Sequence, residues 1–285
     1  SLVIQFNYGF FNFSRLSSFI QDLKKHHISI VIFLHSTKDP IASLDKSLLI
    51  LKDAFLECDR LLVHTPQDMN RLKSIGLVDN VALFPHGILD FDSPIVEYKS
   101  FKSINSSILK TWSISSYGFC LPNKGFPELI RSVEVIKSLG LDVKVNLYTA
   151  IYSKEYEWYY HDLVSLIKTL DLKDSITINK EYLSDIEILV KLSKSDLIVF
   201  PYQSTNESSS AAVRHAISSG KPVVVTPLSI FDDVSSITHY LPGYSYSDIG
   251  SGIANFINNY NTLVDSQESD KEWRNQHYFS NLGPR

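Results

Sequence analysis

Short, continuous runs of apolar residues alternate along the chain with longer stretches whose apolar residues recur every three or four positions. The short runs are typical of buried strands, and the longer spacing is typical of amphipathic helices. In the first part of the chain, the pattern predicts strands at residues 2–6, 28–34, 60–64 and 81–84, and helices at residues 14–26, 44–58 and 66–75. The unbroken β-branched and aromatic run at 28–34 predicts a strand buried on both faces. This alternation favours a parallel sheet with helices on both sides.

A second series of the same kind follows residues 90–107, a serine-containing and charged stretch that we interpret as a linker. The series predicts strands at residues 108–115, 143–148, 176–178, 197–200 and 222–226, and helices at residues 127–139, 154–170, 183–194, 208–219 and 248–260. Together the two series predict two Rossmann-like domains, at residues 1–89 and 108–264, with a polar tail at 265–285. Open α/β sheets bind ligands at the carboxyl ends of their strands, so we expect a site there, in a cleft between the two halves.

The composition fits a globular protein and excludes several other classes. The chain has 285 residues, of which 44% are hydrophobic and 20% charged, so a disordered or fibrous chain is excluded. The net charge of -4 provides no basic footprint for nucleic acid. No apolar run approaches the roughly 18 residues of a membrane-spanning helix. Cys58 and Cys120 form neither a disulfide framework nor a metal-binding pair, which favours a reducing compartment.

Glycine is scarce, with 11 in the chain, so each one can mark a backbone position that only glycine tolerates. Gly118 and Gly125 lie in a segment that follows a predicted strand and precedes a predicted helix. They would let the backbone approach a ligand closely, and Lys124 adds a positive charge suited to phosphate. The spacing is not that of a P-loop, and no serine or threonine follows the lysine. An ordinary strand-to-helix turn with a solvated lysine is the alternative.

A second candidate is the serine-rich loop that leads into the predicted helix beginning at Ser208. The N–H groups of Ser208, Ser209 and Ser210 at this helix start would form an anion site. Glu207 lies at the same place, where a carboxylate could bind sugar hydroxyls. His215 is expected on nearly the same helix face as Ser208. A serine-rich helix cap, with Glu207 serving the helix dipole, is the alternative interpretation.

Three histidines lie at, or shortly after, the ends of predicted strands. His35 follows the run 28–34, His64 ends the next strand, and His86 comes after the third. Any one of them, taken alone, is more often a structural histidine, but the strand-end position favours His35 as a residue of the cleft. The sequence shows no metal-ligand spacing, so no metal is expected. It also lacks the Gly-x-Ser-x-Gly elbow of a serine hydrolase.

Five segments, taken in order along the chain, resemble one known family. They are Leu-Leu-Val-His-Thr at 61–65, Asn-Val-Ala-Leu-Phe-Pro-His-Gly at 80–87, the loop from Gly118 to Gly125, Ser-Asp-Leu-Ile-Val-Phe-Pro at 195–201 through Glu207, and Gly-Lys-Pro-Val-Val at 220–224. The pattern is similar to that of the retaining GT-B glycosyltransferases of family 4, also called glycosyl transferases group 1. The resemblance covers nearly the whole chain. It implies an α/β fold of the GT-B type, with two Rossmann-like domains facing a cleft and a nucleotide-sugar donor bound by the C-terminal domain.

The resemblance also implies site residues, position by position. Lys124 would contact the donor diphosphate, Glu207 would hold donor sugar hydroxyls, and His35 would face the donor sugar, so these three are expected to be catalytic. The positions expected to bind the donor are Gly118, Lys124, Tyr182, Ser208, Ser209, Ser210, Arg214 and His215. The family uses no metal or other cofactor, and its transfer retains the anomeric configuration. Positive charge and helix amides would stabilise the departing diphosphate as it gains negative charge.

This sequence departs from the family's pattern at three places. His215 stands where the family has the second glutamate of a paired motif, which usually binds the nucleotide ribose. The arginine that usually shares the phosphate with the lysine falls near Phe119 and is absent, and Arg214 is a candidate to replace it. The strand at 2–6 resembles a middle strand of the family's N-terminal domain. Residues 1–89 are therefore expected to be the latter part of an incomplete, acceptor-side domain.

Two main hypotheses stay open. The first is a retaining glycosyltransferase that moves a sugar from a nucleotide-sugar donor to a glycan or lipid-linked acceptor in polysaccharide biosynthesis, since the run after Glu207 resembles a bacterial surface-polysaccharide branch. It is expected in the cytoplasm, with peripheral contact to the inner membrane, and with a missing N-terminal segment or another module as partner. The second is a non-catalytic GT-B-like nucleotide-binding or scaffold module. A dinucleotide enzyme is disfavoured, because the chain lacks a Gly-x-Gly-x-x-Gly turn.

Overall fold

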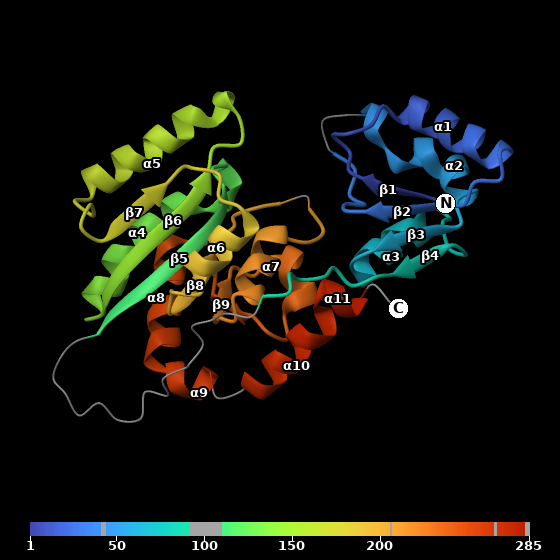
Figure 1. Cartoon of the computed structure of the whole chain (residues 1–285). Helices are drawn as coiled ribbons and strands as arrows, with labels where there is room; N and C mark the ends of the chain where they lie inside the picture. The colour runs from blue at the N-terminus through green and yellow to red at the C-terminus, as the bar shows by residue number, and fades with distance from the viewer. Residues whose placement is uncertain (41–43, 92–109, 206, 265–266, 283–285) are drawn as a thin grey trace. The chain divides into compact units, whose positions relative to one another are not determined.

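A computed structural model describes residues 1–40, 44–91, 110–205, 207–264 and 267–282. The described residues form two compact units (Figure 1). The first unit comprises residues 1–86 together with residues 207–210, and the second comprises the described residues of 87–205 and 211–285. Most of the predicted linker, residues 92–107, lies outside the described residues.

The sheet of the first unit has four parallel strands in the order β1-β2-β3-β4. The strands are Leu2–Phe6, Ile30–Leu34, Arg60–Val63 and Val81–Leu83. The α-helices of this unit are α1, α2 and α3, at Phe13–Lys25, Lys52–Leu56 and Pro66–Ser74. In register, Leu34 lies beside Val63, and Val63 beside Leu83. The carboxyl ends of β2, β3 and β4 therefore lie next to one another at one edge of the sheet.

The apolar core of the first unit packs on one face of its sheet. In β2, Ile30, Ile32 and Leu34 are fully buried, whereas Val31 and Phe33 are half-buried. The prediction that this strand is buried on both faces is therefore wrong. The reason is the strand order. Each strand is added on the same side of the one before it, and right-handed connections in such a sheet place all the helices on one face. Residues of all three helices accordingly share one apolar cluster with the strands.

The segment at residues 44–58 is not the single helix that its spacing predicts. It consists of two short 3-10 helices, Leu44–Lys46 and Leu48–Leu51, followed by α2. Ser47 has an extended backbone, and its hydroxyl accepts a hydrogen bond from the N–H of Leu49, which caps a new helix start. The apolar residues of the segment still join the core of the unit.

The sheet of the second unit has six parallel strands in the order β10-β9-β8-β5-β6-β7. From β5 to β10, the strands are Thr111–Phe119, Asp142–Ala150, Ile176–Asn179, Leu197–Phe200, Val223–Val225 and His239–Tyr240. The chain builds outward from β5 through β6 to β7, then crosses back and builds outward from β8 in the opposite direction. This reversal makes the pair of β5 and β8 the topological switch point of the sheet, where open α/β sheets bind ligands.

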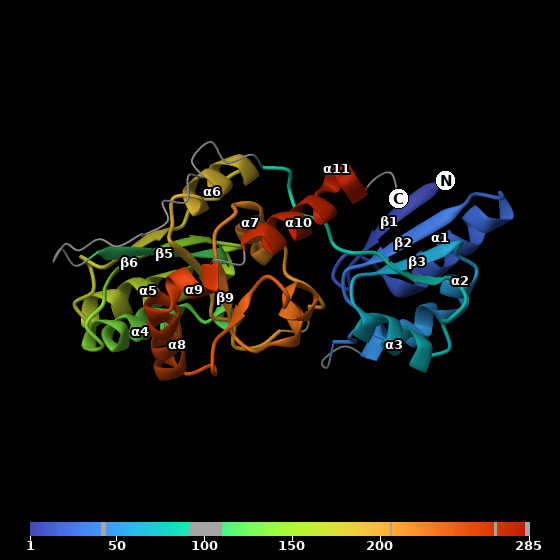
Figure 2. The same ribbon diagram turned by 90° about the horizontal axis from the view of Figure 1, so that it is seen from below.

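Helices cover both faces of the second sheet (Figure 2). On one face lie α4, α5 and α8, at Phe126–Ser138, Glu157–Thr169 and Tyr246–Asn258. On the other face lie α6 and α7, at Asp185–Leu192 and Ala211–Ser218. The central strand β8 is buried at every position, as expected for a strand covered on both sides.

The C-terminal segment predicted to be a polar tail packs on the second unit. Its helices α10 and α11, at Gln267–His277 and Phe279–Leu282, follow α9 at Tyr260–Val264. The N–H of Ile88 donates to the carbonyl of His277 at 2.8 Å, and the N–H of Phe279 donates to the carbonyl of Ile88 at 3.0 Å. Trp273 and Tyr278 pack against the apolar cluster beneath α6 and α7. Within the described ranges, no helix combines the length and the apolar character needed to cross a bilayer.

Candidate functional site

The first candidate segment begins inside a strand. Because β5 runs to Phe119, Tyr117 and Gly118 lie within the strand and not in the loop where the pattern predicts them. The strand continues past residue 115 because β6 pairs with it along its whole length and supplies its hydrogen bonds. A 3-10 helix at Pro122–Lys124 follows, and α4 begins immediately after Gly125.

Gly125 locks the loop after β5 against the segment after β8. Its φ of 72° lies in the left-handed region that favours glycine, and a Cβ here would lie 1.8 Å from the carbonyl oxygen of Pro201. Two hydrogen bonds join the same segments. The N–H of Gln203 donates to the carbonyl of Asn123 at 2.9 Å, and the Asn123 side-chain amide donates to the carbonyl of Ser204 at 3.1 Å. The two loops at the switch point are therefore held together.

Lys124 lies buried at this switch point. Lys124 is only 8% exposed, and its Nζ lies 4.0 Å from the centre of the Tyr202 ring. Tyr202 follows β8 and is itself buried. An ammonium over an aromatic face gains cation–π stabilisation, which increases when the pair is shielded from water. Lys124 is thus not the solvated lysine of the alternative interpretation.

The serine-rich loop precedes its helix, since α7 begins at Ala211 and not at Ser208 as predicted. Serine hydroxyls compete for backbone hydrogen bonds and favour turns and caps over helix interiors, which explains the later start. Glu207 is exposed, whereas Ser208 and Ser210 are buried. The roles predicted for Glu207 and for the amides of residues 208–210 stay predictions.

Asp68 is a buried carboxylate that the sequence analysis missed. Its oxygens accept hydrogen bonds from the hydroxyls of Thr37 at 2.5 Å, Thr65 at 2.6 Å and Ser208 at 2.7 Å. The guanidinium of Arg71 lies 3.5 Å away. These partners satisfy a group that would be costly to bury alone. The signal available in the sequence is the threonine three residues before an acidic residue, the pattern of a capped helix start.

Arg214 is paired inside the second unit. It is almost fully buried in α7 and forms an ion pair with Asp233, which lies in the 3-10 helix Ser229–Val234. Burial lowers the pKa of Arg214, and burial raises the pKa of Asp233, although the opposite charge of the partner counters both shifts. The structure therefore gives Arg214 a partner within the fold, and its contact with a donor stays a prediction.

His215 also has a carboxylate partner. Its Nε2 lies 2.9 Å from Asp185 at the start of α6, and its Nδ1 lies 2.9 Å from the carbonyl of Ala211. The ring of Tyr117 lies 5.6 Å from the His215 ring, centre to centre, and burial raises the pKa of this tyrosine to about 12. Tyr182, between β7 and α6, is 75% exposed. An aromatic, a histidine and a carboxylate thus gather near the strand ends of the second unit.

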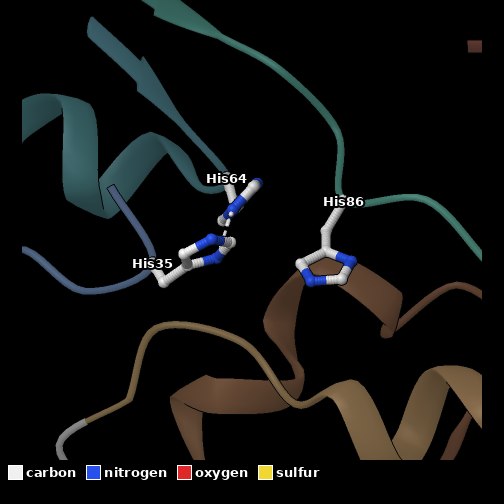
Figure 3. A group of neighbouring side chains, drawn as sticks. All are labelled: His35, His64 and His86. Atoms are coloured by element: carbon white, nitrogen blue, oxygen red, sulfur yellow. Dashed lines mark hydrogen bonds between the residues drawn. The ribbon is translucent and has the colours of Figure 1, made fainter. Parts of the chain in front are cut away.

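The three strand-end histidines meet in the first unit (Figure 3). His35, His64 and His86 follow β2, β3 and β4, whose carboxyl ends are adjacent. The ring centres of His35 and His64 are 5.3 Å apart, and those of His64 and His86 are 4.8 Å apart. One nitrogen of each ring lies within 4.8 Å of those of the other two. The sequence predicts that each histidine lies at a strand end. It does not predict that the three lie together, because they are far apart along the chain.

Hydrogen bonds orient two of these rings. His64 Nδ1 lies 3.1 Å from the carbonyl oxygen of Phe84, and His35 Nε2 lies 2.6 Å from Oε1 of Gln5. The remaining nitrogens, His64 Nε2 and His35 Nδ1, are 3.3 Å apart. Burial lowers the pKa of His35 below its ordinary 6.5, which favours the neutral ring at physiological pH.

Comparison with known proteins places the fold. No protein-family model matches the chain, and no curated protein sequence matches it. HepE of Anabaena in complex with UDP is similar with a TM-score of 0.74 and 14% identity, over 97% of this chain and 74% of that one. The trehalose-phosphate synthase (UDP-forming) of Burkholderia vietnamiensis has a TM-score of 0.73 and 10% identity, over 98% of this chain and 69% of that one.

Sucrose-phosphate synthase of Thermosynechococcus elongatus is also similar, with a TM-score of 0.68 and 14% identity, over 95% of this chain and 76% of that one. With these neighbours and its two parallel-sheet units, the chain has the α/β fold of the GT-B class. At identities this low, the similarity shows the fold alone.

Proposed function

We propose that this protein is a glycosyltransferase that uses a nucleotide-sugar donor. The observation that carries the proposal is the switch point of the second unit, where Gly125 locks two loops together and Lys124 lies buried with its ammonium over the Tyr202 ring. Sheets of this topology bind ligands at that point, and a shielded ammonium suits the diphosphate of such a donor. The fold adds support, because HepE was solved with UDP and with UDP-glucose, and the trehalose-phosphate synthase is described as UDP-forming.

In the proposed reaction, the bond between the donor sugar and the diphosphate breaks, and its electron pair leaves with the diphosphate oxygen. The acceptor hydroxyl oxygen bonds to the sugar, and its proton passes to an oxygen of the departing diphosphate. Lys124 and the amides of residues 208–210, in the segment that leads into α7, would stabilise the growing negative charge of the leaving group without a metal ion. Glu207 would hold sugar hydroxyls and His35 would face the sugar. The resemblance further suggests that the configuration at the sugar is retained.

The nucleotide would bind beside Tyr182 and His215. An exposed aromatic ring such as that of Tyr182 suits stacking on a base. His215 replaces the glutamate that usually binds the ribose, but it pairs with Asp185, whose side chain is 60% exposed. The Asp185 carboxylate would accept hydrogen bonds from the ribose hydroxyls in place of the glutamate. The pair of His215 and Asp185 is therefore our candidate for the ribose contact.

The acceptor is proposed from the sequence resemblance alone. We expect a glycan or a lipid-linked saccharide, as in the assembly of polysaccharides, with contact to a membrane surface where such lipids lie. An assay with short glycans in one arm and lipid-linked saccharides in vesicles in the other tests this class. Transfer to neither acceptor, by a chain that hydrolyses its donor, would contradict the acceptor assignment and leave the donor assignment intact.

The donor assignment is tested in two stages. Saturation-transfer NMR of the whole chain against a panel of nucleotide sugars should find at least one that binds. With that donor, Lys124→Ala should slow hydrolysis or transfer by about 100-fold or more, the usual effect of removing one group that stabilises a developing anion. Glu207→Ala should also slow the reaction. If both variants keep full activity, the site assignment is wrong.

Matched controls exist on the solvent side of α5. Lys168 and Glu157 are both exposed there and are not assigned to the site. Lys168→Ala and Glu157→Ala should leave donor binding and rate unchanged, because charges exposed to solvent interact only weakly with other groups. A loss of activity in these variants would show that the assay responds to charge in general rather than to the site.

The second candidate function is a nucleotide-binding or scaffold module without catalysis. Two observations favour it: Arg214 is already paired with Asp233, and His215 stands where the resemblance expects a glutamate. Both reduce the number of groups left to bind a donor. This candidate predicts binding without turnover, or no binding by a folded chain, in the same NMR experiment.

A further inference from the structure

The histidine group of the first unit contains two ring nitrogens that face each other, and the proposed transfer does not use them together. Figure 3 shows the rings of His35 and His64 turned toward one another, with His86 opposite them on the segment after β4. His64 Nε2 and His35 Nδ1 are 3.3 Å apart. The state of these two nitrogens depends on where the ring protons are.

The outer nitrogens of both rings face oxygen acceptors. The carbonyl oxygen of Phe84 lies 3.1 Å from His64 Nδ1, and Oε1 of Gln5 lies 2.6 Å from His35 Nε2. Such oxygens accept hydrogen bonds and cannot donate them, so the outer nitrogens carry the ring protons. In neutral rings, the inner nitrogens then present two lone pairs to each other. That arrangement is repulsive unless a proton or a metal cation lies between them.

We propose that His35, His64 and His86 bind one divalent transition-metal cation, with zinc as the expected ion. Neutral imidazole nitrogens are good ligands for zinc, copper, nickel and iron. Metal-binding histidines commonly donate their other N–H to a backbone carbonyl or similar acceptor, as His64 does to Phe84. Three histidines leave a fourth position for water or another ligand, a known pattern for zinc.

The spacing of the nitrogens fits this ion. Two nitrogens bound tetrahedrally to zinc at about 2.05 Å are about 3.3 Å apart, and the facing nitrogens of His35 and His64 have this separation. The nitrogen of His86 lies within 4.8 Å of them, so it would move inward by at most about 1.5 Å. His86 is half-buried, and rotation about its side-chain bonds provides a movement of that size. The bound ion would tie together the ends of three adjacent strands.

The metal site does not depend on the proposed transferase function, and it replaces the expectation that the chain binds no metal. It does give His35 a second role, because a metal-bound His35 cannot turn its inner nitrogen toward a sugar. His86 separates the two roles, since it is a ligand in the metal site and has no assignment in the transfer. A variant at His86 therefore tests the metal alone.

Cobalt(II) titration of the whole, metal-stripped chain is the direct test, because tetrahedral cobalt absorbs visible light much more strongly than octahedral cobalt. We expect one cobalt per chain, tetrahedral bands typical of nitrogen ligands, and displacement by zinc. Gln5→Ala removes the exposed partner of His35 and should weaken binding by about 10–100-fold. His86→Gln removes a ligand and should weaken binding further. His161→Gln, at an exposed histidine of α5, should change nothing.

Three results would overturn the proposal: no cobalt binding, bound cobalt without tetrahedral bands, or unchanged affinity in His86→Gln. The inner nitrogens would then be bridged by a shared proton instead. A sulfur-to-cobalt band in the ultraviolet would overturn it as well, because it would place the ion on Cys58 or Cys120, which are free and buried. Circular dichroism confirms that each variant is folded, and neither Gln5 nor His86 is fully buried.

Discussion

Replacing Gly125 by alanine is the sharpest perturbation of the candidate donor site. This glycine has a φ of 72° and lies between Lys124 and α4. An added Cβ would meet two backbone atoms of Pro201, the oxygen at 1.8 Å and the carbonyl carbon at 2.7 Å. Backbone atoms cannot rotate away as a side chain can. The segment after β8 must therefore shift if the substitution is to be accommodated.

Two energetic costs add in this variant. The left-handed backbone costs alanine about 1–2 kcal/mol that glycine avoids. Moving packed atoms to relieve an overlap of this kind costs about 1–3 kcal/mol. Gly125→Ala should therefore lower the free energy of unfolding of the second unit by about 2–5 kcal/mol. It should also weaken nucleotide binding, because the shift moves Lys124.

Two other glycines provide matched controls. Gly140 and Gly220 have φ values of 82° and 74°, and nothing lies within 4 Å of a Cβ added at either position. Gly140→Ala and Gly220→Ala therefore carry only the backbone cost, about 1–2 kcal/mol. The excess loss in Gly125→Ala isolates the close approach to Pro201.

Tryptophan fluorescence during urea unfolding measures this loss in the second unit. The chain has 3 tryptophans, Trp112, Trp158 and Trp273, and all belong to that unit. Each variant's unfolding midpoint and slope then give its free energy of unfolding. If Gly125→Ala is no less stable than the two control variants, the two loops at the switch point are not locked as described.

Three further predictions concern buried polar groups. Asp233→Ala should lower the free energy of unfolding by about 3–5 kcal/mol, because it leaves the buried charge of Arg214 without its partner. Thermal unfolding should show a much smaller effect for the exposed neighbour Asp232→Ala, and equal effects would contradict the ion-pair argument. Asp68→Ala leaves several buried hydroxyls without their acceptor and should cost about 1–3 kcal/mol, seen as faster amide exchange around β3 and α3. Burial lowers the pKa of His239 below 6.5, so the unfolded chain takes up this proton first as the pH falls. The second unit should lose stability from about pH 6.5 downward, and His239→Gln should flatten that loss; a curve that stays unchanged in the variant would refute the assignment.

Apolar periodicity was enough to locate most strands and helices of this chain. β1, β3 and β8 lie where the pattern predicts them, because short runs of apolar and β-branched residues favour strands by their own residue types. The ends of elements depend on neighbours as well. β5 extends to Phe119 because β6 pairs with it, and the helix at 44–58 breaks at Ser47 because a local hydroxyl competes for the backbone.

The candidate donor site could be proposed from residue types, but the burial of Lys124 and the close packing at Gly125 could not. Gly125 and Lys124 indicate a candidate phosphate-binding loop in the sequence, and that role stays a prediction. Only the strand order brings β8 beside β5, and with it Pro201 against Gly125 and Tyr202 under Lys124. The sequence alone leaves open whether Lys124 is solvated. It is buried because β8 pairs beside β5.

The histidines show the same division most clearly. The sequence by itself determined that His35, His64 and His86 each follow a strand, since apolar runs end directly before or at them. Their meeting was decided by the tertiary structure, in which β2, β3 and β4 pair in parallel and in chain order. Strand order is set by how connections cross the sheet and bury their helices, which is a property of the whole unit and not of any local spacing.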